Sequence, residues 1–451
     1  MLVRDQILQL TGRQFLNGYG DAMAQIDALL TNGALLAQSL QLAPGLGLSA
    51  AQANALTQNM AIMELREVAG QQVWVPVVYL ARNSVVTDQG ALIAGRDIAL
   101  DNLSAFDSKG LIKADNNLAL GTQADRSLNI SGGLESGGAM SLTTAGSGDI
   151  NLLSTQLKAG QLFASAGGNL NLETLTDTRT VSSFGANRSI TEIGPLASIE
   201  VAGNASIRSG GDLNQKGATI SVGGNADLKV AGDWNLDTVQ SREVTSAQRR
   251  DGNSHTEVVR NTGSTVDIKG RLIAEVTDLN ARGAQIATGT NSAIAAENIR
   301  LSAAVDETKV LSDSRSSRHS ETKDIQDQRL RGSSISADGN LVLHATQNIE
   351  LQASAIQATG NLGLSAAGSV TLGSQTEAHL YDSTHVGMKS NLLSSKTKTE
   401  ADTVDQLFSV GSVISGKNVV VAAGNDISVK GSHIDAEADT TLLAGRDVSI
   451  V

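Results

Sequence analysis

The sequence lacks cysteine and is poor in aromatic residues, and each shortage excludes a class of protein. Without cysteine the chain has no disulfide framework and no cysteine-based zinc site. Aromatic residues make up 2% of its 451 residues, which argues against an enzyme that binds polysaccharide on aromatic platforms. The apolar runs fall short of the roughly 18 residues that a membrane-spanning helix needs, and Met1–Arg4 does not open a signal peptide.

A dominant block of charge is also missing. The formal net charge is −12, and acidic and basic residues are spread along the chain. We therefore expect no nucleic-acid partner, because nucleic acid is bound by clustered positive charge.

The six histidines do not form a helical zinc motif. His379 and His385 are six residues apart, with Glu377 and Asp382 nearby, and together they offer the ligand types of a metal site. Their place in a polar excursion favours solvated hairpin residues instead. We expect no metal site and no cofactor.

Catalytic residues are also not expected. β-Helix enzymes that cleave acidic polysaccharides use clustered Asp, Arg or Lys, and the pairs Arg96–Asp97 and Arg446–Asp447 have that polarity. Both pairs belong to a motif that repeats along the chain, which favours a structural turn role. We predict that the protein is not an enzyme and has no small-molecule substrate.

What the sequence does contain is a short repeated motif. The segment Ala94–Leu100 returns, loosened, down to Leu443–Ile450. Equivalent positions such as Asn204 and Asn225, or Asp426 and Asp447, are 21 residues apart. A fixed spacing of this kind is typical of a solenoid, in which each repeat forms one coil.

Each coil contains very short alternating runs, such as Leu341–Leu343 and Leu362–Leu364. Alternation places aliphatic side chains on one face, and one coil alone cannot bury them, so coils must stack. The sequence predicts an all-β parallel β-helix with coils of about 21 residues, which we expect to be right-handed. Asn and Asp at the turns can form hydrogen-bonded ladders between coils.

The first 80 residues differ in kind and predict a small α+β capping segment. Apolar residues at helical intervals predict a helix over Tyr19–Leu42, and a capping box at Ser49–Gln52 predicts a second helix that runs toward Val68. Val73–Leu80 is typical of a strand, in which Pro76 requires an edge or a break. We expect this segment to cover the N-terminal end of the β-helix.

Within the predicted β-helix, residues 81–451, four polar excursions interrupt the coils. They lie near 173–193, 237–262, 303–331 and 374–410. Asp251–Gly252 lies at the centre of the second excursion and is a strong hairpin-turn signal. We expect β-hairpins that leave one side of the shaft, are mobile in solution, and can pair with one another or with a partner by strand addition.

Several segments together resemble a known family. Ser390–Glu400, Val410–Val419 and Ala444–Val448 are similar to the haemagglutinin repeat of filamentous-haemagglutinin-like exoproteins of two-partner secretion systems. Leu10–Tyr19 and Val75–Tyr79 resemble the segment that introduces their second, C-terminal repeat region, as in contact-dependent growth inhibition effectors. The resemblance covers essentially the whole chain.

The resemblance implies a protein secreted to the surface of a Gram-negative bacterium through an outer-membrane transporter, which recognises an N-terminal domain that this chain lacks. It implies a repeat region that engages the outer membrane of a target cell and supports toxin delivery. A passive adhesin stalk is the alternative, and a β-helix polysaccharide lyase is a remote one. Because a full repeat runs to Val451, we expect the chain to be a segment of a longer polypeptide.

The candidate contact residues lie on the predicted hairpins. They combine large apolar side chains with arginines near the turns: Phe184, Arg249, Arg250, Val258, Val259, Tyr381, Leu392 and Leu393.

Overall fold

A computed structural model describes most of the chain. The described residues are 2–11, 16, 21–39, 45, 47–48, 52, 56, 58–68, 71–81, 91–183, 185–391 and 393–451. Internal contacts divide the chain into two compact units, residues 1–95 with 108–113, and residues 96–107 with 114–451. No described helix is long and apolar enough to cross a membrane.

The smaller unit combines two helices with a β-hairpin. Its helices are α1 (Leu2–Thr11) and α2 (Ala22–Ser39), and its hairpin strands are β1 (Met60–Val68) and β2 (Gln71–Tyr79). Ile7 and Leu29 are fully buried in its core, where Val78 joins them. The unit also contains the short strands β3 (Leu92–Gly95) and β6 (Leu111–Ala114), which pair with each other.

The predicted second helix does not extend to Val68, because Met60–Val68 is a strand, and most of its predicted first half, from Ser49 to Thr57, lies outside the described residues. β1 pairs antiparallel with β2 along its whole length, from Met60 opposite Tyr79 to Val68 opposite Gln71. Burial alternates along β1, with Ile62 and Glu64 buried and Met63 exposed between them. The pairing with a β-branched partner strand therefore outweighs the local helix signal.

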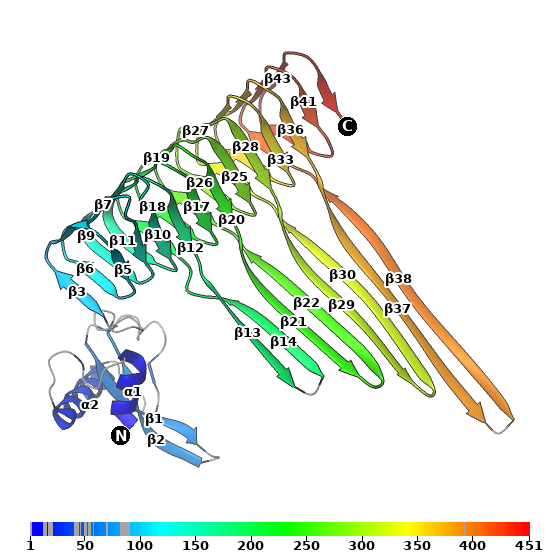
Figure 1. Cartoon of the computed structure of the whole chain (residues 1–451), viewed down its shortest axis with the longest axis horizontal. Coiled ribbons are helices and arrows are strands. Elements are labelled where there is room, and N and C mark those ends of the chain that lie inside the picture. Colours follow the sequence, from blue (N-terminus) through cyan, green and yellow to red (C-terminus); the bar gives the residue numbers. More distant parts are fainter. Residues whose placement is uncertain are drawn as a thin grey trace. The chain divides into compact units, whose positions relative to one another are not determined.

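The larger unit is a parallel β-helix with three faces (Figure 1). In one coil, β15 (Ser198–Val201), β16 (Ala205–Ser209) and β17 (Leu213–Lys216) form the first, second and third faces. The next coil, β18 (Thr219–Val222), β19 (Ala226–Val230) and β20 (Trp234–Asp237), lies on it in register, 21 residues later. The predicted fold class, an all-β parallel β-helix with protruding hairpins, is confirmed.

The remaining coil strands repeat this arrangement. Two long strands cover both the first and second faces: β9 (Gly133–Ala145) and β11 (Gln156–Ala166). The first face continues with β23 (Thr265–Ile268), β26 (Gln285–Thr288), β31 (Ser334–Ala337), β34 (Ala355–Ala358), β39 (Val413–Gly416) and β42 (His433–Ala436). The second face contains β4 (Ile98–Leu103), β7 (Leu118–Ala124), β24 (Leu272–Glu275), β27 (Ser292–Ala296), β32 (Leu341–Ala345), β35 (Leu362–Ala366), β40 (Val419–Ala423) and β43 (Thr440–Ala444).

The third face is a sheet of twelve parallel strands. Besides β17 and β20 it contains β5 (Phe106–Ser108), β8 (Leu128–Ile130), β10 (Ile150–Leu153), β12 (Leu170–Glu173), β25 (Asp278–Arg282), β28 (Asn298–Ser302), β33 (Ile349–Gln352), β36 (Val370–Gly373), β41 (Ile427–Val429) and β44 (Val448–Ile450).

Stacked columns of aliphatic side chains fill the core. On the first face Ile199, Ile220 and Val266 occupy the same position in successive coils, and each is at most 1% exposed. Alternate residues point outward, as the strand period of two requires. Trp234 is fully buried in this narrow core, stacked between Leu213 and Leu279 of the neighbouring coils.

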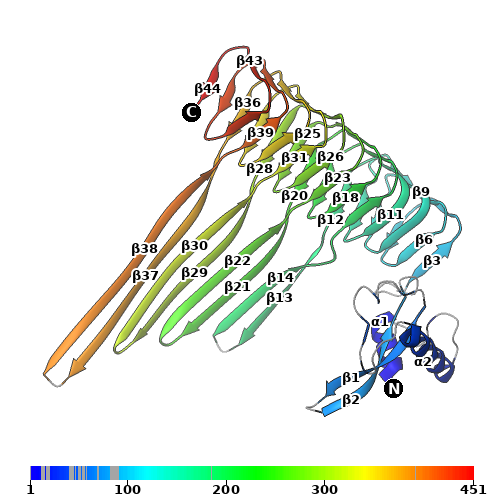
Figure 2. The same cartoon turned by 180° about the vertical axis from the view of Figure 1, so that it is seen from behind.

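Four hairpins leave the β-helix, always between the third face of one coil and the first face of the next. They are hairpin 1, β13 (Thr176–Ser183) and β14 (Ala186–Ile193); hairpin 2, β21 (Val239–Arg249) and β22 (Gly252–Thr262); hairpin 3, β29 (Ala304–Ser316) and β30 (His319–Arg331); and hairpin 4, β37 (Gln375–Asn391) and β38 (Ser394–Val410). Figures 1 and 2 show that they extend to the same side of the shaft and lengthen toward the C-terminus.

The hairpins are not independent ribbons. β14 pairs with β21, β22 with β29, and β30 with β37, so all four form one antiparallel sheet of eight strands. The expectation that the hairpins can pair with one another is therefore confirmed, and their expected mobility in solution stays a prediction. We call this element the hairpin sheet.

Candidate functional site: the hairpin sheet

From β10 onward, hairpins occur at every second corner between the third face of one coil and the first face of the next, whereas the earlier corner between β8 and β9 also has no hairpin. The alternate corners, which have no hairpin, each contain one residue with φ between 46° and 60°: Ser154, Gly217, Gly283, Ala353 and Gly431. A single left-handed residue is therefore enough to turn the chain from the third face to the first. The β-helix can close this corner without a hairpin.

The two-coil interval matches the width of a hairpin. Strands in a sheet lie ~4.8 Å apart, so two stacked coils rise ~10 Å, and a hairpin is two strands wide. Hairpins that leave every second coil are therefore spaced to lie side by side at strand distance. This geometry explains how four polar excursions become one continuous sheet.

A buried serine fixes the base of each of the last three hairpins. Ser264, Ser333 and Ser412 are at most 2% exposed and directly precede a first-face strand. Ser264 Oγ donates to the carbonyl oxygen of Asp237 at 2.7 Å and accepts from the Ala218 N–H of the preceding coil at 3.4 Å. Ser333 and Ser412 repeat both bonds with their own neighbours. The hydroxyls thus satisfy backbone groups where the hairpin interrupts the coil.

Side chains also join the hairpins across their shared boundaries. Arg188 Nε of hairpin 1 donates to Glu243 Oε1 of hairpin 2 at 2.9 Å. Between hairpins 3 and 4, His379 Nδ1 lies 2.6 Å from Asp327 Oδ1. These contacts add specificity to the backbone pairing, because Glu243 is a diagonal neighbour of Arg188 and Asp327 lies directly opposite His379.

One row of side chains crosses the hairpin sheet from edge to edge. Successive cross-strand partners place these residues in line on one face: Val181, Arg188, Thr245, Thr256, Val310, Ile325, Tyr381 and Val404. Most are β-branched or aromatic, which suits a pleated surface. The outer strand β38 is exposed along nearly all of its length.

The structure places the predicted contact residues at separate positions on this sheet. Val258 and Val259 are consecutive on β22 and point to opposite faces. Tyr381 belongs to the row that crosses the sheet, two hairpins away. These residues do not gather into one cluster.

The other predicted contact residues are at or beside the hairpin ends. Arg249 and Arg250 are exposed at the end of hairpin 2, and Leu393 is 97% exposed at the end of hairpin 4. Phe184 and Leu392 lie outside the described residues.

Sequence reasoning missed four exposed cations next to the turns. They are Arg315 and Arg318 of hairpin 3, and Lys389 and Lys396 of hairpin 4. The signal was available, because basic residues cluster at the centres of three excursions in a chain whose net charge is −12.

The two histidines considered for a metal site do not come together. His379 contacts Asp327 and Glu377, with Glu377 Oε2 3.7 Å from His379 Nε2. The ring of His385 instead lies edge-on to that of His319, with centroids 4.2 Å apart. Among the described residues no group of three histidine or acidic side chains is arranged to hold a metal ion.

The repeated acidic turn residues form ladders between coils. Asp97 Oδ1 accepts from the Asn116 side chain at 2.8 Å and the Asn117 N–H at 3.2 Å. Asp426 Oδ1 accepts from the Asp447 N–H at 3.3 Å. These bonds support the structural role predicted for the turn motif.

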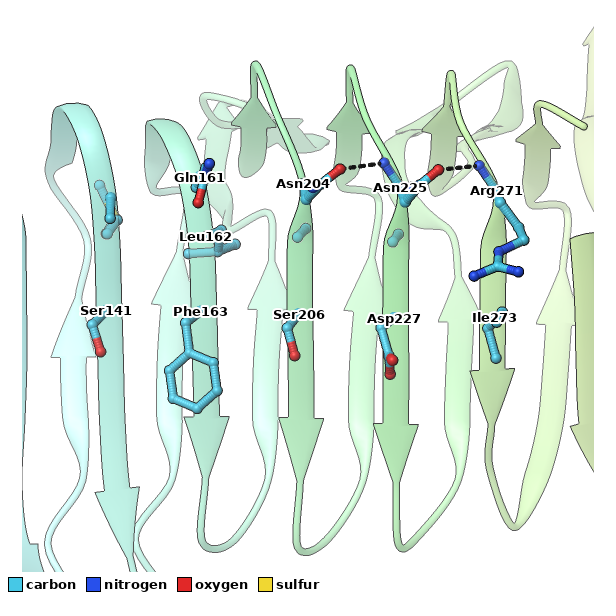
Figure 3. Close-up of a pocket in the computed structure, with 14 residues that line it drawn as sticks. Ser141, Gln161, Leu162, Phe163, Asn204, Ser206, Asn225, Asp227, Arg271 and Ile273 are labelled. Carbon is cyan, nitrogen blue, oxygen red and sulfur yellow. Dashed lines mark hydrogen bonds between the residues drawn. The ribbon is translucent and has the colours of Figure 1, made fainter.

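A shallow groove of about 450 Å³ lies on the second face (Figure 3). The outward residues Ser141, Phe163 and Ser206 line up along it, and the Phe163 side chain is 43% exposed. At its rim Asn204 Oδ1 accepts from the Asn225 N–H, and Asn225 Oδ1 from the Arg271 N–H. Its polar side chains thus continue the ladder of the β-helix.

Comparisons with known proteins agree with this architecture. The hemagglutinin repeat family matches residues 107–188, 196–249, 245–321, 311–398 and 390–451. The chain is 38% identical to tRNA nuclease CdiA-2 of Burkholderia pseudomallei over 100% of its own length and 14% of that protein. It is 39% identical to Toxin CdiA of Yersinia pestis over 77% of its length and 11% of that protein.

A third relative is the 16S rRNA endonuclease CdiA of Enterobacter cloacae, which is 31% identical over 100% of the chain and 14% of that protein. The chain therefore spans about one seventh of the length of such relatives. No solved structure matches it.

Proposed function

This chain belongs to the hemagglutinin repeat family, and we propose that it is a non-catalytic repeat region of a secreted contact-dependent growth inhibition exoprotein. In this proposal the hairpin sheet contacts the outer membrane of a target cell and supports delivery of a toxin. Export uses an outer-membrane transporter of a two-partner system, as the family resemblance implies. The nuclease activities in the relatives' names belong to proteins of which this chain matches about one seventh.

The observation that carries the proposal is that the β-helix does not need the hairpin sheet. Corners such as that at Gly217 close with one left-handed residue, yet from β12 onward every second corner of this kind carries a hairpin. These insertions lie on one side and are held in a single sheet by cross-hairpin pairing. Insertions on one face of a solenoid often form its contact surface.

The experiment uses the full-length Burkholderia pseudomallei relative with this chain in place of its matching segment. All four hairpins are replaced by short Gly-Ser turns, and secretion, target-cell binding and toxin entry are measured separately. Normal secretion and cell binding with loss of toxin entry is the expected result. A control inserts the same linker between Asp338 and Gly339, in an exposed turn of the β-helix between β31 and β32, and so leaves the hairpin sheet intact.

Unchanged toxin entry without hairpins would favour the second candidate, a passive adhesin stalk. The continuous stacking of the twelve third-face strands supports that alternative, because it provides a long shaft without any contribution from the hairpins.

A further inference from the structure

Positive charge in the hairpin sheet is divided into paired and unpaired groups. Along the flanks, several cations form ion pairs, as in Arg179 with Glu192 and Arg242 with Glu257. Six exposed cations beside the turns have no ion pair or side-chain hydrogen bond to any described residue: Arg249, Arg250, Arg315, Arg318, Lys389 and Lys396. We call these six the tip cations.

The tip of hairpin 4 retains an unfavourable charge arrangement. Lys389 lies directly opposite Lys396 in the strand pair, and like charges in this position destabilise a hairpin. Residues 386–399 contain three lysines and no acidic residue. Between the two facing lysines the chain carries Leu393, which is 97% exposed. An anionic partner that accepts an apolar side chain would relieve the repulsion and cover the leucine.

We propose that the ends of hairpins 2, 3 and 4 dock on an anionic lipid surface, with the tip cations at headgroup phosphates and Leu393 at the acyl boundary. The inference rests on the proposed function and assigns its contact surface. Basic residues are attracted to anionic headgroups, and an exposed apolar side chain adds partition into the interface.

The arrangement of the charges favours a lipid surface over a single compact anionic ligand. The six tip cations are distributed over three hairpins, whose ends form a row along the free side of the sheet (Figure 2). Neighbouring hairpins are spaced by ~10 Å, the width of two strands. One phosphate cannot bridge such a row, whereas a membrane presents many phosphates at once.

The test measures sedimentation of the full chain with vesicles of phosphatidylcholine alone or of phosphatidylcholine mixed equally with phosphatidylglycerol. The test variant changes all six tip cations to Gln. The control variant changes six exposed β-helix cations to Gln and so has the same net charge: Arg126, Arg208, Lys216, Arg271, Lys417 and Lys430. Circular dichroism and thermal melting verify that both variants are folded.

The wild type and the control variant are expected to bind the mixed vesicles, and added salt is expected to weaken binding. The tip variant should bind at least ~10-fold more weakly, because its row of headgroup contacts is lost. A fluorophore at Leu393→Cys should shift to the blue with mixed vesicles only. Inorganic phosphate should not compete, which separates a lipid surface from a free phosphate site.

The proposal is overturned if both variants lose binding equally, if wild type binds neutral vesicles as well, or if phosphate competes. It is also overturned if the chain binds target cells but no vesicle, which would indicate a protein partner. Toxin entry that requires the hairpins but tolerates the tip variant would leave the proposed function intact. If vesicle binding depends on the tip cations but toxin entry does not depend on the hairpins, the lipid-docking proposal stands and the proposed function fails.

Discussion

Single side chains connect one coil to the next on the outside of the β-helix. On the third face, Asn151 Nδ2 donates to Asn129 Oδ1 at 2.8 Å, Asn171 to Asn151 at 2.7 Å, and the ladder continues through Asn214, Asn235 and Asn280. Each amide donates to one coil and accepts from the next, so the ladder uses both ends of the group. The predicted asparagine ladders are therefore present.

A neighbouring ladder stacks carboxylates, and this creates a measurable pH dependence. Burial and the adjacent carboxylates of Asp278 and Asp212 raise the pKa of Asp233. A raised pKa means that the folded state holds the proton more tightly than the unfolded state, so ionised Asp233 costs stability at neutral pH. We expect Asp233→Asn to stabilise the protein there by less than about 1 kcal/mol. Thermal unfolding should show this gain disappearing as the pH falls below the unfolded-state pKa.

Asp278 serves as a control, because its replacement by Asn should change stability at neutral pH in the opposite direction. Burial opposes its ionisation, but hydrogen bonds from Arg300 and Asn298 outweigh this and lower the pKa of Asp278. Asp278→Asn should therefore destabilise the protein at neutral pH, and the loss should shrink on acidification. The same sign for both substitutions would contradict the assignment of the two carboxylates.

At the scale of elements, the boundary between hairpins can be tested by cross-linking, because the chain has no cysteine of its own. Val258 of β22 lies opposite Thr308 of β29. Val258→Cys with Thr308→Cys should form a disulfide in high yield on oxidation, since directly opposed residues have close Cβ atoms. Peptide mapping by mass spectrometry measures the yield.

The control pairs Val258→Cys with Lys309→Cys, whose side chain points to the other face of the sheet. If hairpins 2 and 3 moved independently, both cysteine pairs would cross-link to a similar extent. A clear preference for the first pair is the outcome that the sheet requires.

The sequence predicted the coils well because their signal is local and repeated. Asn204 and Asn225 identified the period, and their side-chain to backbone bond spans the same 21 residues. The turn at Asp251–Gly252 likewise predicted the end of hairpin 2, where Gly252 adopts φ 156°. Both features depend on a few neighbouring residues, so they are visible without the fold.

What the sequence could not give depends on distant partners. The capping box at Ser49–Gln52 predicted a helix toward Val68, whereas pairing with β2 makes Met60–Val68 a strand. Similarly, nothing within residues 239–249 indicates that one edge of β21 pairs with β14 and is not left exposed to solvent. The tip cations can be read in the sequence, but their alignment along one end of the hairpin sheet follows only from the spacing of the hairpins. Long-range pairing is thus the part that periodicity alone does not determine.

At the scale of the whole molecule, the stacking of coils and the pairing of hairpins must share one spacing. Removing residues 265–333 joins Ser264 to Ser334 and deletes two coils together with hairpin 3. Both the coil register and the interval of two coils between hairpins are preserved, so hairpin 4 can pair with hairpin 2. Because repeat proteins depend on nearest-neighbour contacts, we expect this variant to fold with both the β-helix and the hairpin sheet intact.

Removing residues 334–354 instead deletes one coil and joins Ser333 to Ala355. Ala355 occupies the same coil position as Ser334, the residue that normally follows Ser333. The β-helix stays in register, but hairpins 3 and 4 now leave adjacent coils, ~5 Å apart, where there is room for one strand and not for two. Hydrogen exchange should show normal protection in the coils and lost protection at those amides of β30 and β37 that bond across the boundary between hairpins 3 and 4, while amides that bond within each hairpin stay protected. Retained protection of the boundary amides would mean that the two-coil interval does not organise the hairpin sheet.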